Sequence, residues 1–254
     1  MAEKNLNVDL SGKTALVTGA SRGIGKAISL ALAHAGANVV IAARSEDDSS
    51  SLPGNIYKTT KEIQGSGGKA LPIRCDVTIA DQVQNMVEKS VHTYGAIDIL
   101  VNNAGILNGA DFLTTDINCF NNIWQVNVLG PFLCTRAVLP IMIPRRSGSI
   151  ISISSDLSES THSRNNIYSA SKAALTRMML KLAVEVSEHN IAVNLIYPGM
   201  IRSDGMIAQV PSDMLDRCPP PSVVGPSAVW LAAQDATSYT GKICHVNTFG
   251  TDWP

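Results

Sequence analysis

A tyrosine and a lysine lie four residues apart in the segment IYSASKAALTRMM, residues 167–179. If this segment is helical, Tyr168 and Lys172 lie one turn apart and project from the same face. A free phenol has a pKa of about 10 and is protonated at neutral pH, but a nearby ammonium in a partly desolvated site lowers that pKa. The pair is therefore a candidate general acid–base catalyst, although most isolated YxxxK patterns are ordinary residues of a helix surface.

Two further polar residues fall where such a site is expected. Ser155 ends a predicted strand thirteen residues before Tyr168, and parallel sheets bind ligands at the carboxyl ends of their strands. The Ser155 hydroxyl could therefore hydrogen-bond a substrate oxygen. Asn127 lies in a long helical segment that follows NNAG, residues 102–105, where an adenine could rest.

The segment between Ser155 and Tyr168 is unusually polar and should border the substrate. Its polar residues either bind a hydroxylated or charged substrate or face water, and the sequence leaves both readings open. They are Asp156, Ser158, Glu159, His162 and Arg164.

A glycine-rich turn, TGASRGIG, occupies residues 18–25 between a predicted strand and a predicted helix. Glycines allow a tight turn and a close approach of the backbone to a pyrophosphate, while the N–H groups of the helix N-terminus face the anion. The turn therefore predicts a dinucleotide site. The residues expected to contact the dinucleotide here are Gly19, Ser21, Arg22, Gly23, Ile24 and Gly25.

The residues at the end of the second predicted strand bear on the choice between NAD and NADP. An NAD site places a carboxylate there to bind the ribose 2′-hydroxyl, but this chain has Ala43 followed by Arg44. Arg44 and Arg22 are suited to bidentate binding of a 2′-phosphate, so NADP(H) is favoured and NAD(H) remains possible. The acidic residues 46–48 would repel the phosphate if their loop folds back, and Arg44 could instead be a solvated surface charge.

The elements that must position these residues alternate between short apolar runs and helical patterns. Predicted strands cover residues 13–19, 37–44, 69–77, 97–105, 147–155, 191–199 and 242–247. Predicted helices cover 24–35, 55–64, 81–94 with Asp81 as N-cap, and 115–143 with a bend near Pro131; a further apolar stripe runs from Leu175 to Val186. Continuous apolar strands are typical of a parallel sheet covered on both faces. The expected fold is α/β: one Rossmann-like, doubly wound domain spanning residues 1–254, with about seven parallel strands.

Composition narrows the class of protein. The chain has 254 residues and a formal net charge of −1, so it lacks the basic footprint of a nucleic-acid binder. Its N-terminus lacks an apolar signal core, and no apolar run was expected to approach membrane-spanning length, so we expect no membrane partner. The five cysteines are scattered without a CxxC pair. They predict no disulfide scaffold and no metal site, and a reducing, cytoplasmic location.

Together these residues resemble the short-chain dehydrogenase/reductase family, in its single-domain branch, over essentially the whole chain. TGASRGIG matches the cofactor turn of the family, and Asp76 with Val77 matches the pair that contacts adenine. Within NNAG, the matching residues are Asn103, Ala104 and Gly105. PGMIRS, residues 198–203, matches the segment that holds the nicotinamide carboxamide, through Pro198, Gly199, Ile201 and Ser203, with serine in place of threonine.

The resemblance implies a catalytic tetrad of Asn127, Ser155, Tyr168 and Lys172. It implies hydride transfer at C4 of a nicotinamide, with Tyr168 exchanging a proton with the oxygen of an alcohol or carbonyl substrate. Ser155 would polarise that oxygen, Lys172 would lower the pKa of the tyrosine and hold the nicotinamide ribose, and Asn127 would anchor a water in a proton path. Tyr168 and Lys172 thus also count as cofactor-binding residues.

Departures from the family pattern leave the subgroup and the assembly open. The long loop SEDDSSSLPGNIY after the second strand, with GGKALP, is similar to the hydroxysteroid-dehydrogenase-like subgroup. Asn247, Thr248 and Phe249 replace the usual Asp-Gly-Gly, and the tail is short. A homodimer or homotetramer is expected, but tetramer packing through the last strand is less certain.

Three functional readings compete. The first is an alcohol dehydrogenase or ketone reductase; the second is other chemistry on this scaffold, such as enoyl reduction or dehalogenation; the third is a non-catalytic NADP(H)-binding redox sensor. The YSASK spacing and the complete tetrad favour the first. The proline-rich residues 202–226 are either a substrate lid or a plain surface loop.

Overall fold

The computed structural model describes residues 8–47, 53–107, 111–161, 165–207 and 212–254. Among these residues, seven strands form one sheet in the order β3-β2-β1-β4-β5-β6-β7, and every paired neighbour is parallel. The strands are β1 (Thr14–Thr18), β2 (Asn38–Ala43), β3 (Lys69–Arg74), β4 (Ile99–Asn102), β5 (Gly148–Ile153), β6 (Ile191–Tyr197) and β7 (Ile243–His245). The predicted fold class, a doubly wound parallel sheet of seven strands, is confirmed.

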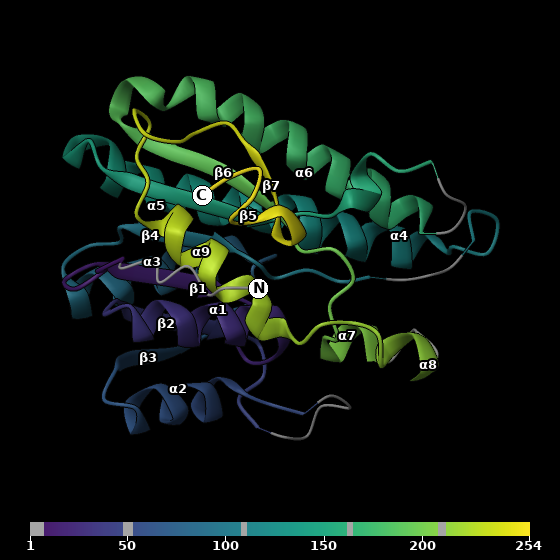
Figure 1. The fold of residues 1–254 in the computed structure, drawn as a ribbon, viewed down its shortest axis with the longest axis horizontal. Coiled ribbons are helices and arrows are strands. Elements are labelled where there is room, and N and C mark those ends of the chain that lie inside the picture. Colours follow the sequence, from purple (N-terminus) through teal and green to yellow (C-terminus); the bar gives the residue numbers. More distant parts are fainter. Residues whose placement is uncertain (1–7, 48–52, 108–110, 162–164, 208–211) are drawn as a thin grey trace.

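Helices connect the strands and cover the sheet (Figure 1). The α-helices are α1 (Gly23–His34), α2 (Ile56–Gly65), α3 (Ala80–Tyr94), α4 (Ile117–Trp124), α5 (Gly130–Arg145), α6 (Asn166–Glu185), α7 (Asp204–Ile207), α8 (Ser212–Leu215) and α9 (Gly225–Ala232). A π-helical segment, η1 (Gln125–Leu129), joins α4 to α5. Short 3-10 turns are η2 (Asp156–Ser158), η3 (Ser187–His189), η4 (Pro221–Val224) and η5 (Val246–Thr248).

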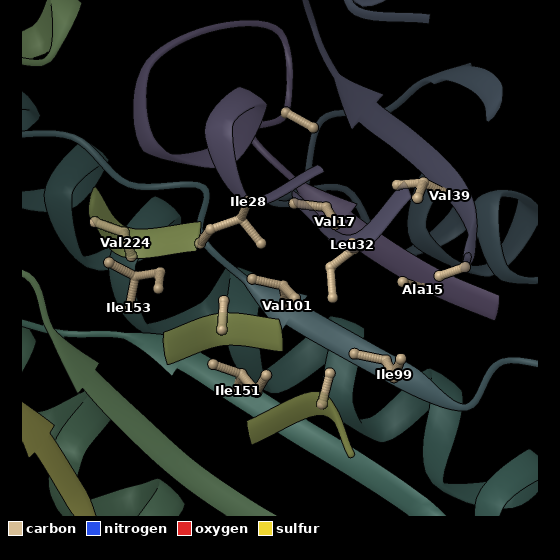
Figure 2. Packing of buried hydrophobic residues seen from close by; sticks show 14 of the residues in the cluster. Ala15, Val17, Ile28, Leu32, Val39, Ile99, Val101, Ile151, Ile153 and Val224 are labelled. Carbon is tan, nitrogen blue, oxygen red and sulfur yellow. The ribbon is translucent and has the colours of Figure 1, made fainter. Parts of the chain in front are cut away.

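Alternate residues of the strands feed two hydrophobic cores, one on each face of the sheet. Ala15 and Val17 of β1 point to one face and Leu16 points to the other, because side chains alternate along a strand. Figure 2 shows the first core, where Val17 and Val101 pack beneath Ile28 of α1. Residues of α1, α2 and α9 complete this core, and residues of α3, α5 and α6 complete the other.

The strands end earlier than the sequence pattern predicts. The predicted strands run to residues 77, 105, 155 and 199, but β3, β4, β5 and β6 end at Arg74, Asn102, Ile153 and Tyr197. Past these ends the regular pairing is lost: the Ser154 N–H still donates to the Ile196 carbonyl of β6, whereas the Asn103 N–H bends back to the Val101 carbonyl and to the Thr18 hydroxyl. These early exits produce the loops that line the site.

The predicted long helix exists, and its irregularity precedes Pro131. Pro131 has no N–H to donate to the carbonyl of Asn127, four residues earlier, which interrupts the α-helical ladder. The Gly130 N–H reaches back to the Gln125 carbonyl, five residues earlier, and the chain forms the π-helical turn. Such turns occur frequently at functional sites, and this one carries Asn127.

Two sequence expectations about helices need correction. By length and composition alone, the stretch Ile117–Arg145 is apolar enough to cross a membrane, contrary to the expectation for the whole chain; its buried residues, such as Val138 and Met142, belong to the core beneath the sheet. Helix α3 begins at Ala80 rather than at an Asp81 N-cap. The Asp81 carboxylate lies in the first turn, where it interacts favourably with the helix dipole.

Candidate active site

A cavity of about 970 Å³ opens at the carboxyl ends of β1 to β6. Parallel strands present these ends at one edge of the sheet, so loops that are distant in the sequence meet there. In Figure 1, α7 and α8 extend from the same end of the sheet as α4. The predicted site residues that line the cavity are Gly19, Ser21, Arg22, Gly23, Ile24, Gly25, Arg44, Asp76, Val77, Asn103, Ala104, Gly105, Ser155, Tyr168, Lys172, Pro198, Gly199, Ile201 and Ser203.

The glycine turn forms one end of this cavity, and its glycines are required by geometry. Gly19 has φ +64°, and a Cβ there would lie 2.8 Å from Asn103 Nδ2. A Cβ at Gly25 would collide with the Gly19 carbonyl and the Asn103 amide. Gly23 has φ +55° and opens α1, whose first N–H groups have no partner within the helix. The turn therefore offers backbone donors to an anion and leaves it room.

The end of β1 is tied to the end of β4 by side-chain hydrogen bonds. The Thr18 hydroxyl donates to the Val101 carbonyl (3.2 Å) and accepts from the N–H groups of Asn103 (3.0 Å) and Ala104 (3.1 Å). The Asn103 amide donates to the Thr18 carbonyl at 2.8 Å. TGASRGIG and NNAG, 77 or more residues apart in the chain, thus form one rigid wall.

Both arginines of the predicted phosphate site line the cavity, and each has protein partners. Arg22 Nη2 donates to Ser45 Oγ (3.0 Å) and to the Gly54 carbonyl (2.9 Å). Arg44 Nη1 lies 3.8 Å from Asp76 Oδ2, and its side chain is 64% exposed. The planar fork of N–H donors on a guanidinium suits a phosphate group, and Arg44 is the more exposed of the two candidates.

The first acidic residue of the following loop turns away from this pair. The Glu46 carboxylate accepts a hydrogen bond from the Tyr57 hydroxyl (3.0 Å) and lies 3.4 Å from Arg74 Nε. Its charge is therefore compensated locally. Asp47 also has a partner within the protein. Position 48 lies outside the described residues.

Tyr168 and Lys172 lie on α6 and both line the cavity, as their spacing on one helix face predicts. Lys172 Nζ lies 5.7 Å from the centroid of the Tyr168 ring. The ammonium is buried and donates a hydrogen bond to the Ile153 carbonyl at 2.8 Å. This bond holds the lysine against the end of β5, beside the tyrosine.

The pKa of Tyr168 differs from the sequence expectation. Burial raises the pKa of Tyr168 to about 12, the hydrogen bond with Ser155 lowers it in part, and the Asp156 carboxylate raises it further. Burial also lowers the pKa of Lys172 to about 8. In the protein alone, desolvation of the phenolate therefore outweighs the hydrogen bond from Ser155 that favours it.

Asn127, the fourth predicted tetrad residue, does not line the cavity but lies directly behind its wall. Its side-chain amide accepts a hydrogen bond from the Ile106 N–H (2.9 Å) and donates to the Ile106 carbonyl (3.0 Å). It also donates to Ser171 Oγ (3.0 Å), which in turn donates to the Tyr168 carbonyl (2.6 Å). Asn127 thus links the loop after β4 to the helix turn that carries the tyrosine.

The polar segment after β5 is divided between cavity and interior. Ser155 caps η2 by accepting a hydrogen bond from the Leu157 N–H (3.2 Å), and its hydroxyl lies 3.2 Å from Asp156 Oδ1. Asp156 borders the cavity as predicted. Ser158 and Glu159 instead hydrogen-bond the hydroxyl of Tyr197 and do not line the cavity, so the structure does not support the substrate-binding reading for these two residues. His162 and Arg164 lie outside the described residues.

Several lining residues escaped the sequence analysis. The apolar residues Ile106, Leu157, Met200 and Met206 also line the cavity. Met200 lies within the PGMIRS motif, so the sequence already pointed to its position. Ile106 lies in a loop, and Leu157 and Met206 lie in short helical turns, which are too short to show a periodic pattern.

Metal ligands are not gathered at this cavity. Within the described ranges, no three His, Cys, Asp or Glu side chains are grouped to hold a metal ion. The five cysteines are free thiols, three of them buried.

Comparison with known proteins identifies the family. Residues 13–213 match the family model described as short chain dehydrogenase. The chain belongs to the short-chain dehydrogenase family. This confirms the resemblance predicted from the sequence and makes the chain a relative of oxidoreductases.

Three relatives show how far this likeness extends. The chain is 35% identical over 247 residues to the 3-oxoacyl-(acyl-carrier-protein) reductase of Thermotoga maritima, and the match covers 94% of this chain and 97% of the relative. It is 35% identical to hydroxysteroid dehydrogenase-like protein 2 of Danio rerio, but spans only 56% of the length of that protein. A solved Beutenbergia cavernae structure, a putative NAD(P)-dependent gluconate 5-dehydrogenase with bound NADP, has a TM-score of 0.84 and 30% identity over 94% of this chain and 97% of its own.

Proposed function

We propose that the chain is an NADP(H)-dependent oxidoreductase that interconverts a small-molecule alcohol with a ketone or an aldehyde. The observation that carries this proposal is one continuous cavity lined by two chemically different groups of residues. The glycine turn and two arginines form one group, and Tyr168, Lys172 and Ser155 form the other. A dinucleotide bound along this cavity would bring its nicotinamide to the tyrosine.

The chain's own residues fit that coenzyme. The N–H groups of α1 would bind the pyrophosphate, and Asp76 with Val77 would hold the adenine. The stretch from Pro198 to Ser203 would hold the carboxamide end. When bound, NADP(H) supplies or accepts a hydride at C4 of its nicotinamide.

Tyr168 then handles the proton. During reduction its hydroxyl donates a proton to the carbonyl oxygen as the carbonyl carbon receives the hydride, which yields the alcohol. During oxidation the phenolate accepts the hydroxyl proton of the alcohol while the hydride leaves its carbon. Ser155 Oγ, hydrogen-bonded to Tyr168, donates to the same oxygen and stabilises developing charge there.

Lys172 and Asn127 support this proton transfer. The buried Lys172 ammonium stabilises the phenolate by Coulomb attraction. Asn127 holds Ile106 and Ser171 in place, and its own carbonyl has a proline at the position that would normally donate to it. That carbonyl is therefore suited to hold a water in a proton path to solvent.

The preference for NADP(H) is supported by charge at the end of β2. Arg22 and Arg44 line this part of the cavity, and Ala43 occupies the position of the carboxylate that an NAD site requires. Glu46 is compensated by Arg74 and does not oppose a 2′-phosphate. NAD(H) remains the second candidate coenzyme.

The proposed activity is tested with a panel of ketones, aldehydes and sugars, and with the matching alcohols in reverse. Absorbance at the nicotinamide band reports the consumption of NADPH or NADH. The proposal expects at least one carbonyl compound to be reduced faster with NADPH than with NADH. Coenzyme binding without turnover of any compound would instead support the redox-sensor reading.

Arg44→Asp should weaken NADPH binding about 10- to 100-fold while changing NADH binding much less. The guanidinium would make charge-assisted hydrogen bonds to a 2′-phosphate, which contribute about 1.5–3 kcal/mol, and NADH has no such group. Fluorescence titration with both coenzymes measures the ratio. Arg136→Asp, on α5 and outside this cavity, makes the same change in net charge and serves as control. Equal losses for the two coenzymes would reject the phosphate assignment.

Assembly and location follow as parts of the same proposal. We expect the chain to act as a single catalytic domain in a cytoplasmic homodimer or homotetramer, with no nucleic-acid or membrane partner. The near-complete overlap with the Thermotoga maritima reductase supports the single domain. Light scattering would give the number of subunits.

A further inference from the structure

Tyr197 lies behind the site and has no role in the proposed chemistry. It is the last residue of β6, directly before Pro198, and only 1% of its surface is exposed. A buried phenol needs hydrogen-bond partners, because an unpaired one is costly. The hydrogen-bond partners of the Tyr197 hydroxyl lie in the two segments that carry the proposed catalytic residues.

The Tyr197 hydroxyl contacts two elements at once. It lies 2.6 Å from Ser158 Oγ and donates to Glu159 Oε1 at 3.2 Å, both in the segment that follows Ser155. It also lies 3.2 Å from Thr176 Oγ1 on α6. One hydroxyl therefore joins the loop after β5 to the helix that carries Tyr168 and Lys172.

The chain of hydrogen bonds continues to the catalytic lysine. Thr176 Oγ1 lies 2.8 Å from Ser154 Oγ, and Ser154 Oγ donates to the Lys172 carbonyl at 3.2 Å. Ser154 and Thr176 are both buried, so these contacts are shielded from water. The network ends at the residue directly before Ser155.

The turn that Tyr197 holds has two sides. Ser155, Asp156, Leu157 and Ser160 border the cavity, whereas Ser158 and Glu159 face Tyr197. Fixing the rear side of such a short turn fixes the front side as well. The edge of the Tyr197 ring packs on His245 of β7, at 5.1 Å between centroids, which restrains the phenol itself.

We propose that Tyr197 is a positioning residue that sets the substrate-facing wall formed by residues 155–160. This inference rests on the proposed function for its kinetic consequence, but its structural part stands separately. Tyr197 touches neither coenzyme nor substrate in this account; it acts through Ser158 and Glu159. Loss of its hydroxyl should make residues 155–160 more mobile. We expect this to weaken binding of the carbonyl substrate more than it slows the chemical step.

The test compares Tyr197→Phe with Tyr239→Phe. Tyr239 is a matched control, because its hydroxyl accepts a hydrogen bond from Cys244 Sγ, away from the cavity, and its ring packs on Trp230 and Trp253. Hydrogen exchange followed by mass spectrometry is measured on peptides covering residues 153–161. Tyr197→Phe should accelerate exchange there about tenfold, with exchange in β1 and β4 unchanged, and Tyr239→Phe should not. Unchanged exchange in 153–161 would overturn the proposal.

Kinetics supply the second readout, with NADPH and the carbonyl compound of the panel that wild type reduces fastest. Tyr197→Phe should raise the KM for that compound about five- to tenfold, with kcat changed less than threefold and the affinity for NADPH unchanged. Ser158→Ala, which removes the partner from a half-buried position, should give a similar rise, and the double variant should add little to either. Fully additive effects, or a loss of kcat alone, would contradict a shared positioning role.

If wild type reduced no compound, the proposed function would fail while the exchange experiment still decided the role of Tyr197.

Discussion

Tyr168→Phe should lower kcat for carbonyl reduction by about 10³-fold or more and leave NADPH affinity within about threefold. In the proposed mechanism this hydroxyl carries the proton, and general acid–base catalysis contributes about 10²–10⁴-fold. The aromatic ring stays in place, so the cavity wall beside Lys172 keeps its shape. Steady-state kinetics and a fluorescence titration of NADPH separate the two quantities.

A second tyrosine variant controls for the loss of a phenol as such. Tyr94→Phe removes a hydroxyl at the end of α3, outside the cavity, and should keep full activity. Turnover by Tyr168→Phe close to that of wild type would mean that another group delivers the proton. Loss of NADPH affinity equal to the loss of kcat would mean that the tyrosine serves binding.

Lys172→Met should lower kcat about 10²-fold at neutral pH and move the pH profile of alcohol oxidation upward by about 2 pH units. Oxidation needs the phenolate, and the Lys172 ammonium favours it; without that charge a higher pH is required to ionise Tyr168. Methionine has nearly the same length, so the change removes the charge and the bond to the Ile153 carbonyl while retaining the volume. Rates of alcohol oxidation between pH 6 and about pH 10 measure the shift.

The same variant should change how stability depends on pH. The folded pKa of Lys172 is lowered to about 8 from 10.5. Between these values the unfolded chain binds more protons than the folded protein does, so this lysine makes stability rise with pH across the window. Lys172→Met should remove that rise in urea unfolding experiments. Above pH 10 the raised pKa of Tyr168 acts in the opposite direction in both proteins, because the folded state then holds a proton that the unfolded chain loses.

For the activity of Lys172→Met, an unchanged pH profile of alcohol oxidation would contradict a role for the ammonium.

The sequence was sufficient to predict the fold and the residues that meet at the site. Apolar strands and intervening helices specify a parallel sheet, and a parallel sheet brings the carboxyl ends of all its strands to one edge. Gly19, Asn103, Ser155 and Tyr168 are far apart in the sequence, yet all four line the cavity at that edge. The topology of the sheet is sufficient to explain why they meet.

Side-chain direction in irregular turns was beyond the sequence. The sequence left open whether Ser158 and Glu159 face substrate or water, and their orientation is decided by a tyrosine 39 and 38 residues further along the chain. Asn127 was predicted to anchor a water, and the hydrogen bonds of its side-chain amide to Ile106 and Ser171 were not foreseen. Neither contact has a periodic signature, because both join loops through tertiary packing.

The pKa of Tyr168 was also beyond the sequence, because spacing indicates proximity and not burial. The i, i+4 pattern correctly placed the ammonium beside the phenol. The cost of desolvating the phenolate depends on everything else that packs around the ring, and here it raises the pKa to about 12. A catalytic role then requires that the bound coenzyme complete the electrostatic environment.

The most direct test is an ultraviolet titration of tyrosinate absorbance in the presence of saturating NADP⁺, taken as the difference between wild type and Tyr168→Phe. The positive nicotinamide ring and the Lys172 ammonium together should bring the pKa of Tyr168 from about 12 down to near 8 or 9, so the difference signal should appear below pH 10. The same titration without coenzyme should show no such signal in that range. A difference that stays flat below pH 10 with NADP⁺ bound would contradict Tyr168 as the group that exchanges the proton.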